Sequence, residues 1–240
     1  MDDKIRKLKT IVDESENIVF FGGAGVSTES GIPDYRSAGG LYSKKYKEQF
    51  SPETIMSHDF LMAKPELYYE YFKENRLFSD EKPNAAHIKL AELEAQGKLK
   101  AVITQNIDGL HQAAGSKNVL ELHGSTKRFY CSCCGKKHSK DCLLQESLVP
   151  KCDCGGMIRP DVVHFGEQLD DETVQKAVGF IQNADVFIIG GTSLAVYPAA
   201  GLIDLYNGDK LVLINRDATA RDNIADLIIR DPIGETLGQI

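Results

Sequence analysis

Four apolar runs constrain the fold of this chain more than any other feature, because none of them alternates with polar residues. They are IVFF at 18–21, AVIT at 101–104, DVFIIGG at 185–191 and KLVLIN at 210–215. Strands that are buried on both faces lack such alternation, which is typical of parallel sheets. Helical periodicity separates the runs, at 3–15, 85–97 and 170–184. The pattern predicts an α/β fold with a doubly wound parallel sheet, to which 118–124 and 225–230 add short strands.

Two stretches interrupt this alternation, at 38–84 and 126–160. The first contains prolines, glycines and the aromatic-rich run LYYEYFKENRLF, which indicate several short helices. The second contains all six cysteines and little apolar periodicity. We expect the two stretches to pack together as a smaller domain, inserted into a larger one made of 1–37, 85–125 and 161–240.

The cysteines have the spacing of zinc ligands. Two knuckles, the first with a two-residue gap and the second with only one, contain Cys131, Cys134, Cys152 and Cys154. Four thiolates suit a closed tetrahedral site, which leaves no position for a catalytic water. We therefore predict one structural Zn²⁺ ion bound by these four residues. Cys133 is an alternative ligand, and Cys142 is left over.

The first apolar run leads directly into the glycine-rich segment FFGGAGVSTESGIPDYRS at 20–37. Gly23 and Gly25 suit a turn that holds the phosphates of a dinucleotide at the end of a buried strand. The third glycine of the usual fingerprint is replaced by Thr28, and Gly31-Ile32-Pro33 prevents a helix from continuing. The segment therefore predicts a phosphate-binding turn that is followed by a rigid polar loop.

Polar side chains follow the other strands, at the edge where doubly wound sheets bind ligands. Gln105, Asn106 and Asp108 come after 101–104, and there they suit either a ribose and a nicotinamide amide or a capped turn. His123 follows the next strand and is a candidate general base, although a lone histidine is more often structural. The turns GGTS and INRDAT repeat the arrangement, which favours a single crevice.

Charge and hydropathy restrict the expected partners. The net charge is −7, which argues against a nucleic-acid binder and is compatible with a lysine-rich partner. The first residues, MDDKIRKLKT, precede no apolar stretch long enough for a signal peptide or a membrane span. We expect a soluble, cytoplasmic monomer that binds neither nucleic acid nor membrane.

Seven segments occur together in an order and spacing that one known family shares. They are GAGVSTESGIPDYR, TQNIDGLHQAAG, ELHGS, the paired cysteines, IRPDVVHFGE, GTSLAVYPAA and INRDAT. In these segments the chain resembles the sirtuins, NAD-dependent protein deacylases, over nearly its whole length and as a bacterial-type catalytic core. The resemblance implies a Rossmann-like domain that binds NAD⁺ as co-substrate and a smaller domain formed by a zinc ribbon and a helical module.

The resemblance also implies a role for individual residues. It assigns to the cofactor site Gly23, Ala24, Gly25, Ile32, Asp34, Tyr35, Arg36, Gln105, Asn106, Ile107, Asp108, Gly191, Thr192, Ser193, Asn215 and Arg216. An acetylated-lysine protein or peptide would add as a strand along Val163, Phe165, Gly166, Glu167, Leu194 and Val196. The implied catalytic residues are His123 and Asn106.

In the implied reaction, the amide oxygen of the acyl-lysine attacks the ribose carbon as nicotinamide leaves. His123 then deprotonates a ribose hydroxyl, which attacks the resulting imidate. Addition of a water releases free lysine, so that the products are free lysine, nicotinamide and an O-acyl-ADP-ribose. Close positioning matters, because an amide is a poor nucleophile. Intact ELHGS and HFGE segments favour deacylation over the alternative of protein mono-ADP-ribosyl transfer, and retained His123 and Asn106 argue against a silent NAD sensor.

Three departures from the family pattern bear on specificity. Tyr35 replaces a phenylalanine, and His164 stands where an aromatic residue is frequent. The stretch YYEYFKENR lacks the Tyr-x-x-Arg pair of desuccinylating members, which favours acetyl or another neutral acyl group. A nicotinamide dehydrogenase would need an acidic residue about 20 residues beyond the glycine turn, where this chain has the basic run AGGLYSKKY.

Overall fold

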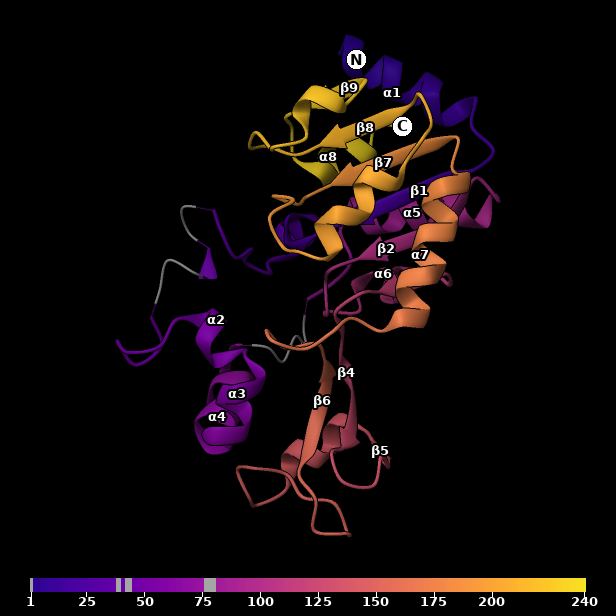
Figure 1. Ribbon diagram of the computed structural model, residues 1–240. Coiled ribbons are helices and arrows are strands. Elements are labelled where there is room, and N and C mark those ends of the chain that lie inside the picture. Colours follow the sequence, from indigo (N-terminus) through magenta and orange to yellow (C-terminus); the bar gives the residue numbers. More distant parts are fainter. Residues whose placement is uncertain (1, 38–39, 42–44, 76–80) are drawn as a thin grey trace.

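The computed structural model describes residues 2–37, 40–41, 45–75 and 81–240. Its main sheet has six parallel strands in the order β3-β2-β1-β7-β8-β9 (Figure 1). The strands are β1 Ile18–Gly22, β2 Leu99–Thr104, β3 Val119–Glu121, β7 Val186–Gly190, β8 Leu211–Ile214 and β9 Leu227–Ile229. The order reverses between β1 and β7, and ligands bind at such a switch point in doubly wound sheets. The predicted fold class is confirmed.

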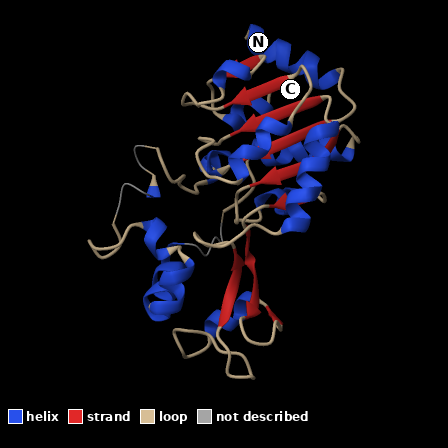
Figure 2. Ribbon diagram, in the orientation of Figure 1, coloured by secondary structure: helices blue, strands red, loops and turns tan. Residues whose placement is uncertain are grey.

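The apolar runs form the inner strands because helices cover both faces of the sheet (Figure 2). All residues of β1, β7 and β8 are buried, which explains why none of these runs alternates with polar residues. One face packs against α1 (Asp3–Asp13), α5 (Ala85–Ala95) and α8 (Ile233–Leu237). The other face packs against α7 (Asp171–Asn183) and the 3-10 helix η5 (Ala199–Leu205).

The long helices begin at side chains that cap them. The side chain of Asn84 accepts from the amide of Ala86 at the start of α5 (2.9 Å), and Asp170 accepts from Thr173 at the start of α7 (2.8 Å). The sequence pattern does not predict α8 or α6 (Leu110–Ala114), because helices of five residues show too little periodicity. Among the described residues, no helix is long and apolar enough to cross a bilayer.

A second, antiparallel sheet extends away from the first (Figure 1). Its order is β5-β4-β6, with β4 Gly124–Cys131, β5 Lys137–His138 and β6 Ile158–Val162. The short helices predicted for the first inserted stretch are α2 Pro52–Ile55, α3 His58–Ala63 and α4 Pro65–Asn75. Buried aromatic side chains of α4 pack against Phe129 and Ile158 in a core cluster of their own. Residues 38–39, 42–44 and 76–80 of that stretch lie outside the described residues.

Two buried histidines are expected to make the free energy of unfolding depend on pH. His87 on α5 and His111 on α6 are 0% and 1% exposed, with ring centroids 4.7 Å apart. Burial lowers the pKa of His87 to about 4 and that of His111 to about 3. Between pH 6.5 and these values only the unfolded chain binds the protons, so stability should fall as the pH falls, by up to about 1.4 kcal/mol per pH unit for each histidine.

Urea unfolding between pH 7 and pH 5 measures this dependence. The variant His111→Leu removes one of the two groups, and its stability should depend less steeply on pH than that of the parent protein. If the free energy of unfolding changed equally steeply with pH in the two proteins, His111 would not be one of the groups responsible, whatever the absolute stabilities.

Candidate active site

Two glycine turns meet at the switch point of the sheet. The amide of Gly25, after β1, donates to the carbonyl of Gly191, after β7, at 2.7 Å. A Cβ atom on Gly25 would lie 2.8 Å from the Gly191 Cα atom, and one on Gly191 would lie 2.3 Å from the Val26 nitrogen. Gly191 also has a φ of +58°. The backbones therefore approach so closely that both turns require glycine.

The chain after the first turn forms a loop, as the sequence analysis predicts. It contains two short 3-10 turns in place of an α-helix, and the Thr28 hydroxyl donates to the Gly25 carbonyl at 2.9 Å. Asn84, which caps α5, donates from its side-chain amide to the carbonyl of Val26 at 2.8 Å. The start of helix α5 thus supports the loop through Asn84. In the usual fingerprint, a helix packs closely at the third glycine instead.

A cavity of about 460 Å³ opens beside these turns. Most of the predicted cofactor, catalytic and substrate residues line it, namely Ala24, Gly25, Asp34, Tyr35, Arg36, Gln105, Asn106, Ile107, His123, Val163, Phe165, Gly166, Glu167, Gly191, Thr192, Ser193, Val196, Asn215 and Arg216. The structure therefore brings segments that are far apart in the sequence to one crevice.

Four other predicted residues are buried and do not line the cavity, and they are Gly23, Ile32, Asp108 and Leu194. The Asp108 carboxylate accepts from the Ser27 hydroxyl at 2.7 Å and from the Leu110 amide at 2.9 Å. Burial raises the pKa of Asp108, although both hydrogen bonds act in the opposite direction. Asp108 thus forms the turn that leads into α6, which was one of the two interpretations of this polar motif.

His123 lies between β3 and β4 and faces the cavity. Its Nδ1 atom is 2.9 Å from the backbone carbonyl of Gln105. Because a carbonyl only accepts, Nδ1 carries the proton of the neutral ring and Nε2 keeps a lone pair. Burial lowers the pKa of His123, although the hydrogen bond to Gln105 opposes the shift. The result is a neutral, oriented imidazole, as a general base requires.

The amide side chains beside His123 suit a polar ligand. The Gln105 amide oxygen accepts from the Thr192 hydroxyl at 3.1 Å, while its buried nitrogen has no hydrogen-bond partner among the described residues. The Asn106 side-chain amide donates to the Ser27 hydroxyl at 3.1 Å. Since a buried donor without an acceptor is costly, the Gln105 nitrogen suits a ligand oxygen. This donor and the close glycine turns fit a dinucleotide.

The cavity is also lined by residues for which neither a motif nor the family resemblance predicts a place in a site. They are Thr28, Glu29, Ser37, Pro52, Met56, Val162, His164, Leu169, Tyr197, Pro198, Ile214, Asp217, Ala218, Asp231, Pro232, Ile233 and Glu235. Asp231 comes two residues after the end of β9, so the rule of polar turns after strands would have found it. Pro52 and Met56 reach the cavity from the helical insertion, and no local pattern predicts this.

The four predicted zinc ligands form one cluster. Their Sγ atoms all lie within 4.8 Å of one another, in Cys131, Cys134, Cys152 and Cys154. The Sγ atoms of Cys131 and Cys154 are 3.5 Å apart, and those of Cys134 and Cys152 are 3.8 Å apart. A tetrahedral ion with Zn–S bonds of about 2.3 Å requires sulfurs about 3.8 Å apart, so the cluster fits one structural zinc ion. Cys142 lies outside it, in the apolar core beside the cluster.

Known proteins are similar to this chain over nearly its whole length. The chain matches the Sir2 family over residues 23–198. It is 57% identical over 237 residues to the NAD-dependent protein deacetylase of Clostridium acetobutylicum, covering 98% of this chain and 97% of that protein.

Two solved structures are also similar over nearly their full length. One is a Sir2 variant with a deacetylated p53 peptide and 3′-O-acetyl ADP-ribose, with a TM-score of 0.90, 40% identity and coverage of 98% of this chain and 96% of that chain. The other is a Sir2 complex with a p53 peptide and NAD⁺, with a TM-score of 0.88, 41% identity and coverage of 99% and 96%. On the match of sequence and fold, the chain belongs to the Sir2 family, the sirtuins.

Proposed function

We propose that this protein removes acetyl or other neutral acyl groups from protein lysines, consuming NAD⁺ and releasing nicotinamide and an O-acyl-ADP-ribose. The observation that carries the proposal is the cavity in which the glycine turns, the Gln105 and Asn106 amides and the His123 imidazole meet the segment 163–167. The relative named as an NAD-dependent protein deacetylase and the Sir2 complex with peptide and acetylated product support it.

Each group in the cavity has a proposed task. NAD⁺ supplies a ribose carbon that is electrophilic because nicotinamide is a good leaving group. The glycine turns and the Gln105 amide nitrogen bind the co-substrate, and Asn106 orients it. His123 accepts a proton from a ribose hydroxyl at Nε2. Ser193, Asn215 and Arg216 bind the adenosine end.

The peptide and the smaller domain complete the proposal. The substrate backbone adds as a strand between 163–167 and 194–196, which gives affinity with little dependence on the peptide sequence. The smaller domain comprises 38–84 and 126–160, and these stretches supply almost the whole of the core cluster around α4. Zinc stabilises this domain and takes no part in the reaction, because four thiolates leave no open position.

The test is an incubation with an acetyl-lysine peptide, with and without NAD⁺, followed by mass spectrometry. Loss of one acetyl mass from the peptide only when NAD⁺ is present, together with O-acetyl-ADP-ribose, is the expected result. Consumption of NAD⁺ with the acetyl group retained and ADP-ribose on protein would favour the transferase instead. Deacetylation without NAD⁺ would refute the proposal.

The pH profile should reflect the burial of His123. Because the base must be neutral, kcat/KM falls as the pH drops through the pKa of His123. Burial lowers this pKa from its usual value of about 6.5, so the acidic limb should lie below pH 6.5. Initial rates between pH 5 and pH 9 would locate the limb. A limb above pH 7 would contradict the assignment.

Acyl specificity should favour uncharged groups. In the stretch YYEYFKENR the residues three positions after Tyr68 and Tyr69 are Tyr71 and Phe72, both buried in the core, and neither is the arginine of a Tyr-x-x-Arg pair. We expect kcat/KM for a succinyl peptide to be at least about 100-fold below that for the acetyl peptide, because a buried carboxylate without a partner is costly. Parallel assays of the two peptides measure the ratio, and equal rates would contradict the expectation.

We also propose that the protein acts as a cytoplasmic monomer without nucleic acid. The net charge of −7 supports the proposal that the protein does not bind nucleic acid. Light scattering of the purified protein tests the monomer, and a gel-shift assay with DNA tests the absence of binding.

A further inference from the structure

The segment 163–167 lies between two cavities, so its position depends on a few anchors. It lines the cavity described above, and four residues of this region also line a second cavity of about 520 Å³, namely Val162, Val163, Gly166 and Glu167. The side chain of Phe165 is 44% exposed, although the residue lies at the proposed peptide site. Because the segment borders cavities on both sides, specific contacts to neighbouring elements hold it in place.

Backbone hydrogen bonds provide the first anchors. The Val163 amide donates to the His123 carbonyl, the Phe165 amide to the Met56 carbonyl, and the His58 amide to the Phe165 carbonyl, each at 3.0 Å. These contacts connect the segment to the base-bearing turn on one side and to the start of α3 on the other.

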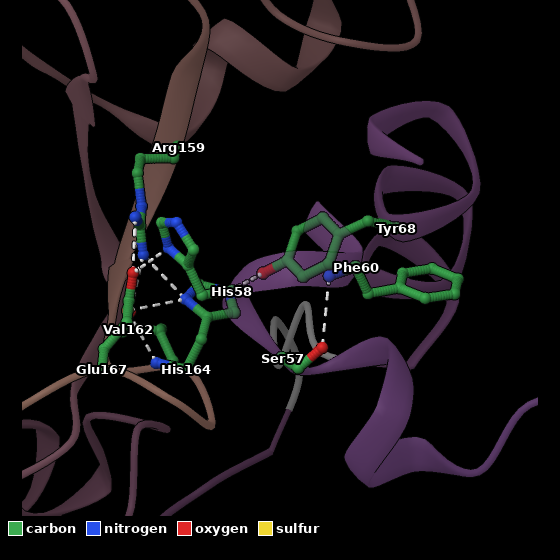
Figure 3. A network of polar contacts seen from close by, with 8 residues as sticks. All are labelled: Ser57, His58, Phe60, Tyr68, Arg159, Val162, His164 and Glu167. Atoms are coloured by element: carbon green, nitrogen blue, oxygen red, sulfur yellow. Dashed lines mark hydrogen bonds and ion pairs between the residues drawn. The ribbon is translucent and has the colours of Figure 1, made fainter. Parts of the chain in front are cut away.

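Glu167 provides a second anchor (Figure 3). Its carboxylate pairs with the guanidinium of Arg159 on β6 at 2.7 Å and with Nδ1 of His58 on α3 at 2.8 Å. Burial alone would raise the pKa of Glu167, but the hydrogen bonds from His164, Arg159 and His58 outweigh it and hold the pKa well below its usual range. The carboxylate is therefore charged and fully engaged.

His164 lies at the centre of the same network, and its side chain has no solvent exposure. Its Nδ1 atom is 2.7 Å from Nη2 of Arg159, and its Nε2 atom is 2.7 Å from the hydroxyl of Tyr68 on α4. Burial is the main reason that the pKa of His164 is lowered, so the ring is neutral near pH 7. A neutral imidazole has one donor and one acceptor nitrogen, and both face partners here.

Tyr68 is equally enclosed. The residue is 0% exposed and packs among Tyr69, Phe72 and His164, with ring centroids between 5.3 and 5.8 Å from its own. Its hydroxyl thus points from the aromatic core of the helical module to the segment 163–167 (Figure 3). The His164 side chain has no contact with solvent, so loss of the Tyr68 hydroxyl would leave Nε2 of His164 unsatisfied unless the segment moved.

We propose that the hydrogen bond between Tyr68 and His164 positions the segment 163–167 for the acyl-lysine peptide, by fixing it to helix α4. Tyr68 and His164 are positioning residues, and neither need contact the reacting atoms. The inference rests on the proposed deacylase function. The affinity for the peptide then depends on a polar contact in the core of the smaller domain, whereas the chemical step does not.

The test compares two conservative variants of neighbouring tyrosines. Tyr68→Phe removes the hydroxyl that contacts His164. Tyr69→Phe is the matched control, because Tyr69 is equally buried on the same helix and its hydroxyl donates to the Ile158 carbonyl. Tyr68→Phe should raise the KM for the acetyl peptide by about 3- to 10-fold, the effect of one lost hydrogen bond, with kcat and the KM for NAD⁺ nearly unchanged. Tyr69→Phe should change stability alone.

A double variant and a second measurement keep the inference testable if one protein is unstable. Tyr68→Phe combined with His164→Phe replaces both partners of this hydrogen bond by apolar rings. Nη2 of Arg159 loses its contact with His164 but keeps its hydrogen bond to Glu167 at 2.8 Å, so the peptide KM should not exceed that of Tyr68→Phe. Hydrogen exchange at the amides of Val163, Phe165 and Glu167 should be faster in Tyr68→Phe than in Tyr69→Phe.

The outcomes separate this inference from the proposed function. Equal peptide KM values and equal exchange rates in the two single variants would overturn the inference. If the parent protein itself does not deacetylate the peptide, the proposed function fails, and the exchange rates alone then decide whether Tyr68 holds the segment. A fall in kcat with no change in peptide KM would also overturn the positioning role.

Discussion

Replacement of His123 by alanine is expected to lower kcat for deacetylation by about 10²- to 10⁴-fold, the range that loss of a general base gives. The imidazole lines the cavity, and its one hydrogen bond to the part of the chain that the structure describes is to the Gln105 carbonyl, so little core packing is lost. The thermal midpoint should therefore stay within a few degrees of the parent protein. Single-turnover assays with the acetyl peptide, followed by mass spectrometry, measure the loss.

Two controls distinguish loss of the base from loss of the site. The affinity for NAD⁺, measured by calorimetry, should change little in His123→Ala, because the glycine turns and Gln105 remain. Added imidazole, which is small enough to enter the vacated space, should restore part of the activity. Turnover at the parental rate would refute the assignment of His123 as the base.

Loss of a zinc ligand is the second change with a large expected effect. Cys131→Ala should abolish zinc binding and lower the unfolding midpoint by roughly 10 °C or more, because bound zinc contributes directly to folding. Activity should fall as well, since β6 leads directly into the segment 163–167 and pairs with β4, which ends at Cys131. Native mass spectrometry and a thermal scan measure the two properties.

Cys133→Ala is the matched control for this change. Cys133 is an exposed neighbour of the cluster, but its sulfur is not among the four that gather there. One zinc ion per chain and an unchanged midpoint are expected for this variant. Zinc retained in Cys131→Ala, or lost in Cys133→Ala, would show that the ligand set is wrong.

The main sheet could be predicted from the sequence because burial on both faces imposes a visible composition. Ile18 to Phe21 and Val186 to Ile189 have no solvent-facing position, so no polar residue interrupts them. The second sheet lacked such a pattern. In β4, Lys127 and Arg128 are consecutive exposed residues, and the register with β6 shifts between Ser125 and Phe129. Buried and exposed residues therefore do not alternate regularly along β4, so the strand could not be recognised from the sequence.

The site was predictable to the extent that it lies at strand ends. Gln105, Asn106 and His123 follow β2 and β3, so their position in the sequence sufficed to place them at the crevice. The contributions of Pro52 and Met56 depend on how the helical insertion packs across the cavity, which no local pattern encodes. The contact between Tyr68 and His164 joins residues 96 positions apart, and no local pattern predicts it either.

The close approach of Gly25 and Gly191 has a consequence for recombining this protein with its relatives. Each turn occupies the space that a side chain of the other would need, so the two turns must be compatible in any recombined chain. A chimera that imports the loop 22–37 from another sirtuin should also import the turn 190–193. Crossover points placed between these segments should be tolerated only where both parents carry glycine at the two positions, because a Cβ atom on either would lie 2.8 or 2.3 Å from the backbone of the other turn.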